Sequence, residues 1–95
     1  MQKIQLKVKK LLPEAKLPAY GSEFAAGADL YALSENPIRI APQETAIVHT
    51  GLAVEIPEGY VGLVFARSGL ATKKGLAPAN KVGVIDSDYR GVLRV

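Results

Sequence analysis

Glycine and proline divide the apolar residues of this chain into short runs, and this punctuation limits it to short elements. Nine glycines and six prolines occur in 95 residues, and clusters such as Pro42-Gln43-Glu44 and Pro57-Glu58-Gly59 have the composition of turns. Between such clusters apolar and polar residues alternate, as they do over residues 3–9, and a period of two is typical of half-buried strands. The sequence therefore predicts an all-β fold in which short strands follow one another quickly.

Individual strands and one helix can be placed on this pattern. The apolar runs 52–56 and 60–65 flank Pro57-Glu58-Gly59 and predict a hairpin. Beyond this hairpin the pattern changes, and helix formers predict one short helix near residues 69–75, with Ser68 as its cap and Gly75 at its end. The other predicted strands cover residues 3–9, 29–32, 38–40, 46–48, 82–85 and 91–95.

Length and composition exclude several classes of protein. Ninety-five residues are enough for at most one domain, so we expect a single domain over 1–95. The chain has no cysteine and only one histidine, His49, which argues against disulfides and against a thiolate or histidine zinc site. No apolar run approaches the roughly 20 residues that cross a bilayer, and the first residues do not form a signal-peptide core. We therefore expect a cytoplasmic protein with no membrane partner.

The net charge of +3 is concentrated near the N-terminus. Residues 1–16 carry five lysines against one glutamate, a local charge of +4, so the remaining residues sum to −1. Such a patch could contact a phosphate backbone, but it lacks the interleaved aromatic residues that stack on bases. The solvated face of a strand is the simpler interpretation, and lysines there also discourage edge-to-edge pairing. We expect no nucleic-acid partner, and the role of this basic strand stays open.

Two clusters concentrate the chemistry of the chain. In residues 80–91 an apolar run meets two carboxylates, Asp86 and Asp88, which would point to the same side of an extended segment. The alternative is a surface turn that the two carboxylates cap through bonds to the backbone. Arg67-Ser68-Gly69 stands at a predicted strand-to-helix junction, where a guanidinium and free backbone N–H groups suit phosphate oxygens. Its alternative is ordinary helix capping by Ser68.

Three motifs, in this order and at this spacing, resemble the first three motifs of the trimeric deoxyuridine triphosphate nucleotidohydrolases, or dUTPases. They are Ala26-Gly27-Ala28-Asp29-Leu30-Tyr31-Ala32, Arg67-Ser68-Gly69-Leu70-Ala71, and Asn80 with Gly83-Val84-Ile85-Asp86-Ser87-Asp88-Tyr89-Arg90-Gly91. The resemblance spans essentially the whole chain. It implies a jelly-roll-like subunit of the dUTPase-type β-clip, a homotrimer with active sites shared between subunits, and Mg²⁺-dependent hydrolysis of dUTP to dUMP and pyrophosphate.

The resemblance also implies roles for residues of the third motif. Asp86 would activate the water that attacks the α-phosphorus, which requires an ionised carboxylate within hydrogen-bond reach of that water. Tyr89 would pack beneath the deoxyribose and leave no room for a 2′-hydroxyl. Uracil would be recognised by Asn80 and by the entering arm of the hairpin, formed by Gly83, Val84 and Ile85.

The remaining site residues that the resemblance implies lie outside this motif. Arg67, Ser68 and Gly69 would hold the phosphates, where donors and positive charge stabilise the transition state. Arg94 would line the substrate pocket. Asp29 would act on Mg²⁺ indirectly, through the water shell that this ion tends to keep. The roles of Asp88 and Arg90 stay open, with an ion pair or a turn brace as the structural alternatives.

The chain departs from the family pattern at two points. Ala66 stands where many members have proline before Arg-Ser-Gly, which removes a backbone restraint. The fourth and fifth motifs have no counterpart, and the sequence stops at Val95 inside a strand pattern, so we expect a domain truncated before these motifs. One alternative function is a non-catalytic nucleotide-binding remnant or assembly subunit. A dCTP deaminase-like enzyme is a lesser alternative, because residues 86–91 match the dUTPase motif better.

Overall fold

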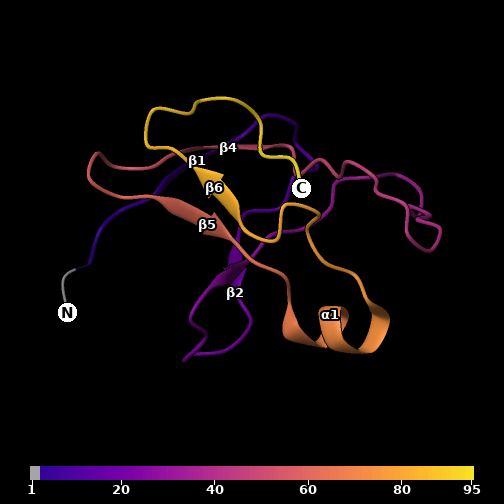
Figure 1. Cartoon of the computed structure of the whole chain (residues 1–95). Coiled ribbons are helices and arrows are strands. Elements are labelled where there is room, and N and C mark those ends of the chain that lie inside the picture. Colours follow the sequence, from indigo (N-terminus) through magenta and orange to yellow (C-terminus); the bar gives the residue numbers. More distant parts are fainter. Residues whose placement is uncertain (1–2) are drawn as a thin grey trace. The chain divides into compact units, whose positions relative to one another are not determined.

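The computed structural model describes residues 3–95, and these residues group into two compact units. The first unit contains residues 55–89 together with the N-terminal residues up to Leu6. The second unit contains Lys7–Val54 and Arg90–Val95. Over residues 3–95 the architecture is built from short strands with a single helix, α1 (Ser68–Lys74), as the turn-rich sequence predicts (Figure 1).

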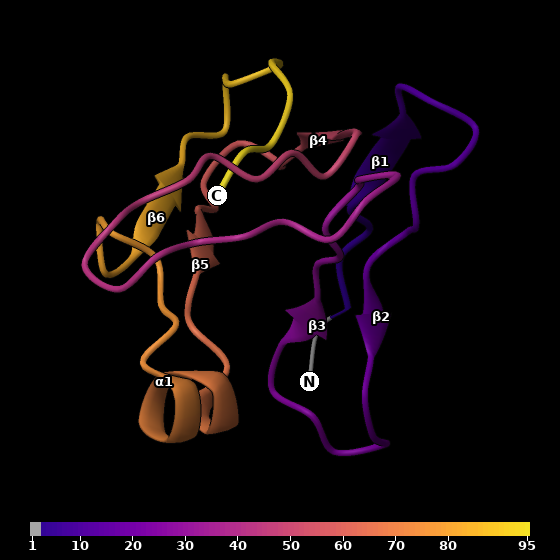
Figure 2. The same cartoon turned by 90° about the vertical axis from the view of Figure 1, so that its right-hand side faces the viewer.

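Short two-stranded sheets make up the second unit. β1 (Lys7–Lys10) pairs with β4 (Leu52–Glu55), whose last residue already belongs to the first unit. β2 (Ala19–Tyr20) and β3 (Ala28–Asp29) form an antiparallel hairpin, with Ala19 opposite Asp29, and Figure 2 shows the two strands side by side. Gly21 lies beside this pair, and a Cβ on it would be 3.4 Å from an Asp29 carboxylate oxygen.

The core of the second unit lies where residues 93–95 form backbone hydrogen bonds with residues 48–52. Val48 and Val95 exchange two backbone hydrogen bonds of 2.7 and 2.8 Å, and the Leu93 N–H donates to the Leu52 carbonyl at 2.8 Å. Thr50 is buried, and its hydroxyl donates to the Leu93 carbonyl at 2.9 Å, so the polar group is satisfied inside the core. The buried apolar residues of this unit are Ala15, Leu52, Val54 and Leu93.

The first unit is organised around one antiparallel ladder and the helix. β5 (Gly62–Val64) pairs with β6 (Gly83–Ile85), and Leu63 lies opposite Val84. α1 (Ser68–Lys74) follows β5 directly and ends at Gly75, which has the left-handed φ of 66° and donates its N–H to the Ala71 carbonyl. The predicted end of the helix is therefore confirmed, because glycine adopts this conformation at little cost.

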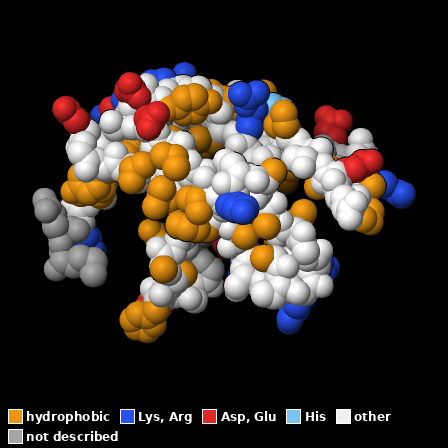
Figure 3. Space-filling model, in the orientation of Figure 1, with side chains coloured by type: hydrophobic (Ala, Val, Ile, Leu, Met, Phe, Trp, Pro, Cys, Tyr) orange, Lys and Arg blue, Asp and Glu red, His pale blue; other side chains and the backbone are white. Residues whose placement is uncertain are grey.

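Glycine at position 62 lets the ladder pack closely. A Cβ there would lie 2.5 Å from Cδ1 of Ile56 and 3.1 Å from Cβ of Ile85. Among the described residues of this unit Ile56 is the buried one, so β5 packs directly against it. The opposite face of the ladder is open: Leu63 is 50% exposed and Val84 is 64% exposed. Figure 3 shows apolar side chains at the surface of the molecule.

Several strand predictions are wrong or only partly right. The predicted hairpin of 52–56 with 60–65 is wrong, because β4 pairs with β1 and β5 pairs with β6. Pro57 explains this in part, since it follows β4 without an N–H to donate to a ladder, although the Pro57–Tyr60 turn itself forms.

Other predicted strands are shorter than expected or are not strands. The N-terminal strand is limited to Lys7–Lys10, and of residues 29–32 only Asp29 lies in a strand, at the end of β3. Residues 38–40 and 46–48 are irregular, and 91–95 contribute only an isolated bridge at Arg94.

Candidate functional site

The strand-to-helix junction places Arg67, Ser68 and Gly69 at the first turn of α1. Arg67 is the N-cap residue, with extended backbone angles (φ −72°, ψ 131°), and its carbonyl accepts the first helical hydrogen bond from the Ala71 N–H. The helix has no side-chain capping hydrogen bond, so the prediction that Ser68 caps it is wrong. Ser68 is instead the first helical residue, and its carbonyl accepts a bond from the Thr72 hydroxyl at 2.8 Å. All three candidate residues are exposed.

Two overlapping turns lead from the helix into β6. The Lys81 N–H donates to the Pro78 carbonyl at 3.0 Å, and the Val82 N–H donates to the Asn80 carbonyl at 2.7 Å. Lys81 lies between the two ends of the second bond and has a φ of 67°. The turns fold the Asn80 side chain back toward the strand, because a Cβ on Gly83 would be 3.5 Å from the Asn80 amide nitrogen.

The β5–β6 ladder uses one backbone edge of β6. In the described part of the chain the sheet has two strands, so β6 pairs with β5 on one side only. The N–H and C=O groups on its other edge are thus not used by the ladder. Gly83 and Ile85 are half-buried, whereas Val84 points to the exposed face.

The acidic segment after β6 is a turn. The Tyr89 N–H donates to the Asp86 carbonyl at 3.1 Å, which makes these residues the first and last of a four-residue turn. Asp86 and Asp88 therefore do not share one side of an extended segment, and that prediction is wrong. The turn instead brings Asp86 and Tyr89 together, and both side chains are exposed.

The two halves of the candidate site lie at opposite ends of the β5–β6 ladder. The register pairs Val64 with Gly83 and Gly62 with Ile85, so the end of β5 that leads to Arg67 is the end at which β6 begins. Figures 1 and 2 both show β6 pointing away from α1. Since β6 advances about 3.3 Å per residue, Asp86 lies about 10 Å beyond Gly83. Asn80 is therefore on the side of Arg67, and Asp86 and Tyr89 are on the other.

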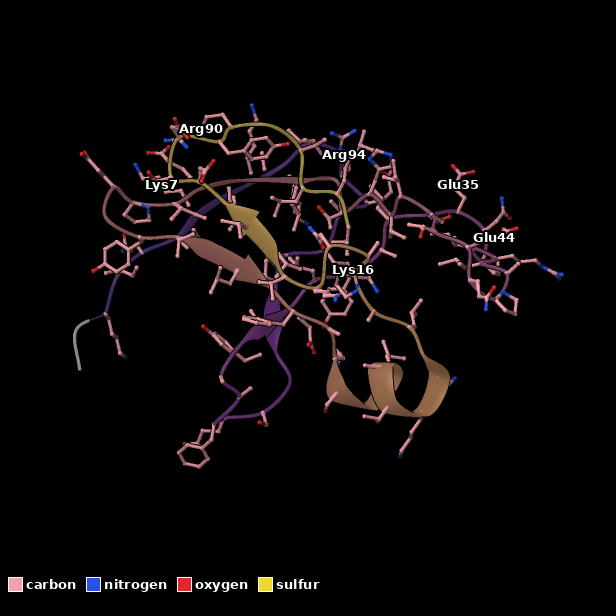
Figure 4. All side chains as sticks on the ribbon, viewed as in Figure 1. Lys7, Lys16, Glu35, Glu44, Arg90 and Arg94 are labelled. Atoms are coloured by element: carbon pink, nitrogen blue, oxygen red, sulfur yellow. The ribbon has the colours of Figure 1, made fainter. Side chains whose placement is uncertain are left out.

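Asp29 and Arg94 belong to the second unit. Asp29 is the half-buried last residue of β3. Arg94 lies opposite His49 in an antiparallel bridge, next to the paired Val48 and Val95, and it is labelled with Arg90 in Figure 4. Lys16, also labelled there, has its Nζ 5.4 Å from the centre of the Tyr31 ring. A cation at this distance from an aromatic face is a stabilising contact.

The possible metal ligands among the described residues do not form a cluster. Among residues 3–95 no group of three or more His, Asp or Glu side chains could hold one. Isolated carboxylates suit an ion that keeps its water shell and is bound by phosphates better than they suit an ion held by protein ligands alone. In the same range no helix is long and apolar enough to cross a membrane.

The left-handed backbone of Lys81, next to the candidate residue Asn80, was not predicted from the sequence. A lysine carries no signal for a left-handed backbone, which is uncommon for residues other than glycine. The one available hint was Pro78-Ala79-Asn80, a composition that favours turns.

Comparison with known proteins gives a consistent result. A sequence profile of the dUTPase family matches residues 13–95. The deoxyuridine 5′-triphosphate nucleotidohydrolase of Aquifex aeolicus is 50% identical in an alignment that covers all of this chain and 65% of the relative. The protein of the same name from Desulfitobacterium hafniense is 56% identical over 84% of this chain and 54% of the relative. The chain thus spans less than two thirds of the length of these relatives.

Solved structures agree in fold. A mutant dUTPase of Staphylococcus bacteriophage 80alpha, determined with dUpNHpp, superposes with a TM-score of 0.80 at 36% identity, over 97% of this chain and 52% of that one. A mutant dUTPase from phage phi11 of S. aureus, whose structure describes a structural Mg(II) ion, gives a TM-score of 0.79 at 35% identity, over 96% of this chain and 57% of that one. The predicted all-β, jelly-roll-like fold is confirmed.

Proposed function

The chain belongs to the dUTPase family, and from this membership we propose that the protein hydrolyses dUTP to dUMP and pyrophosphate. The observation that carries the proposal is the arrangement of the third motif, in which an edge strand leads directly into a turn that joins Asp86 to Tyr89. The strand offers recognition groups for the base, and the two ends of the turn, Asp86 and Tyr89, offer one group for the α-phosphorus and one for the sugar joined to it.

The base is recognised at the entering arm. A uracil edge carries both hydrogen-bond donors and acceptors, and the open backbone edge of Gly83, Val84 and Ile85 can match them. The Asn80 amide, folded toward Gly83, adds a side chain that both donates and accepts. A rigid, closely fitting edge of this kind discriminates against cytosine, since a mismatched donor or acceptor would be left unpaired.

Chemistry follows at the turn. The exposed Asp86 carboxylate accepts a proton from a water, and the water oxygen attacks the α-phosphorus as the bond to the bridging oxygen of pyrophosphate breaks. The Tyr89 ring, at the other end of the same turn, packs beneath the deoxyribose. This short connection supports the pairing of roles, because the α-phosphate is joined to the sugar that Tyr89 would contact.

The phosphates would be bound by Arg67, Ser68 and Gly69. A guanidinium, a hydroxyl and backbone N–H groups without a side-chain cap are suitable donors for phosphate oxygens. Arg94 would contribute from the pocket wall. Mg²⁺, when bound with the substrate, would neutralise phosphate charge, and the Asp29 carboxylate would orient a water of its shell.

We also propose assembly as a homotrimer with shared sites. The phosphate residues and Asp86 lie at opposite ends of one ladder, which favours a site completed by another copy of the chain. The open apolar face supports assembly as well, since Leu63, Phe65 and Val84 are each at least half exposed. Sedimentation or native mass measurements test the oligomeric state, and a monomer at working concentration would contradict this part of the proposal.

The second candidate is a nucleotide-binding chain without catalysis. It is favoured by one observation, that Arg67 and Asp86 lie at opposite ends of the β5–β6 ladder, so that one copy of this unit does not bring the phosphate residues to the water-activating carboxylate. Under this alternative the uracil and phosphate residues bind dUMP or dUTP, but no pyrophosphate forms.

One assay separates these functions. The 95-residue chain, and a version extended through any further residues that its gene encodes, are each incubated with Mg²⁺ and either dUTP or dCTP, and pyrophosphate and ammonia are measured. The proposal expects pyrophosphate from dUTP and little product from dCTP. Nucleotide binding without pyrophosphate from either preparation would favour the second candidate, and ammonia from dCTP would indicate a deaminase.

A further inference from the structure

Lys81 holds a backbone conformation that an ordinary side chain rarely adopts. Its φ is 67°, and the hydrogen bond from the Val82 N–H to the Asn80 carbonyl closes a three-residue turn around it at 2.7 Å. A three-residue turn with positive φ at its centre is the rare and strained form of the γ-turn. Strain of this kind persists where the surrounding structure holds it, and it gathers at ligand sites.

The turn has a direct structural consequence for Asn80. A Cβ built on Gly83 would lie 3.5 Å from the Asn80 amide nitrogen and 3.3 Å from Cβ of Val64. Asn80 is exposed, so packing alone does little to fix the orientation of its side chain. The Asn80–Val82 turn and the preceding Pro78–Lys81 turn are the described contacts that return Asn80 to the start of β6.

We propose that Lys81 is a positioning residue for base selectivity: its left-handed backbone folds the Asn80 carboxamide onto the first residue of the strand that reads the base. The inference rests on the proposed function, and it assigns to Lys81 no contact with the substrate. If the Lys81 backbone became extended, the Val82 N–H would leave the Asn80 carbonyl. The Asn80 amide would then move away from Gly83, and a base with a different hydrogen-bonding edge would be rejected less well.

Two substitutions at Lys81 distinguish the effect of its backbone conformation from the effect of its side-chain charge. Lys81→Val puts a β-branched residue where φ is positive, which such residues strongly disfavour. We expect the ratio of kcat/KM for dUTP to that for dCTP to fall by about tenfold or more in this variant. Lys81→Asn removes the charge but tolerates the left-handed conformation, so it should keep the ratio within about twofold of the parent protein.

The chain offers a matched control for the strain itself. Gln43 has the same φ of 67°, in the turn closed by the Glu44 N–H and the Ala41 carbonyl. Gln43→Val introduces the same kind of backbone conflict in a turn to which no site residue belongs. It should lower the thermal stability, as Lys81→Val does, and leave base selectivity unchanged.

An NMR measurement tests the geometry independently of turnover. We expect a nuclear Overhauser contact between the Asn80 side-chain amide protons and the Gly83 α protons in the parent protein and in Lys81→Asn, and its loss in Lys81→Val. Unchanged selectivity in Lys81→Val, or an equal loss in Lys81→Asn or Gln43→Val, would overturn the inference. If the parent protein releases no pyrophosphate from dUTP, the proposed function fails, and the Overhauser contact alone then decides whether Lys81 positions Asn80.

Discussion

Asp86 and Asp88 stand two residues apart in the same exposed turn, yet we expect turnover to depend on only one of them. Asp86→Asn should lower kcat by at least about 10²-fold, because an amide does not accept the proton of the attacking water. Binding of dUMP should change little, since the amide has nearly the same shape. Pyrophosphate release and calorimetric titration measure the two effects.

The neighbouring carboxylate provides the control for that experiment. Asp88→Asn makes the same chemical change in the same turn and should keep most of the activity. Unchanged pyrophosphate release in Asp86→Asn, or equal losses in both variants, would contradict a general-base role that is specific to Asp86.

Tyr89 carries the second prediction at the residue scale. The residue is 39% exposed, which leaves part of its surface open to a sugar. Tyr89→Ala should raise activity on UTP relative to dUTP by about tenfold or more, because the space for a 2′-hydroxyl opens. Tyr89→Phe keeps the ring and should retain the preference. Steady-state rates on dUTP and UTP decide the matter, and equal discrimination in the alanine variant would argue against packing of this ring on the sugar.

The sequence singled out candidate residues but not their geometry. The pattern around Asp86 and Tyr89 marked one candidate cluster, whereas the assumption of an extended segment paired Asp86 with Asp88 and not with Tyr89. Lys81 was missed altogether, because its backbone angle is set by the two turns around it and not by the identity of its side chain.

The β5–β6 ladder carries a prediction at the scale of elements. Gly62→Ala should destabilise the protein by about 1–3 kcal/mol, because the added methyl has no space. It would contact Cβ of Ile85 at 3.1 Å, an atom fixed to the strand that carries the base-recognition residues. Gly27→Ala is the control, since nothing lies within 4 Å of its Cβ position. Urea unfolding measures both variants, and equal stabilities would mean that the ladder tolerates the methyl.

Local sequence signals predicted where an element ends better than they predicted which strands pair. Gly75 ended α1 as predicted, since a left-handed residue after a helix is most often glycine. The start was shifted by one residue, because Arg67 supplied the extended backbone of the cap position without any side-chain bond. The pairing of β4 with β1 joins residues more than forty positions apart, and no short-range pattern encodes such a contact.

At the scale of the whole molecule, the family and fold followed from the order of three motifs, but the completeness of the site did not. The single domain over 1–95 stays a prediction, and the described residues form two compact units. The resemblance implied that active sites are shared between subunits. The ladder now gives that idea a physical basis within one unit, since its two ends separate Arg67 from Asp86.

Shared sites can be tested by mixing two inactive variants. The extrapolated register places Asp86 opposite Val61, and Arg67 is six positions beyond Val61, a span of roughly 20 Å for an extended chain. Arg67→Ala removes the phosphate half of the site and Asp86→Asn removes the water-activating half. If each site takes these halves from different copies, random reassembly of a 1:1 mixture should restore about a quarter of the parent activity, because one site in four receives both intact halves. If both halves came from the same copy, every site in the mixture would lack one of them, and the mixture would stay as inactive as each variant alone.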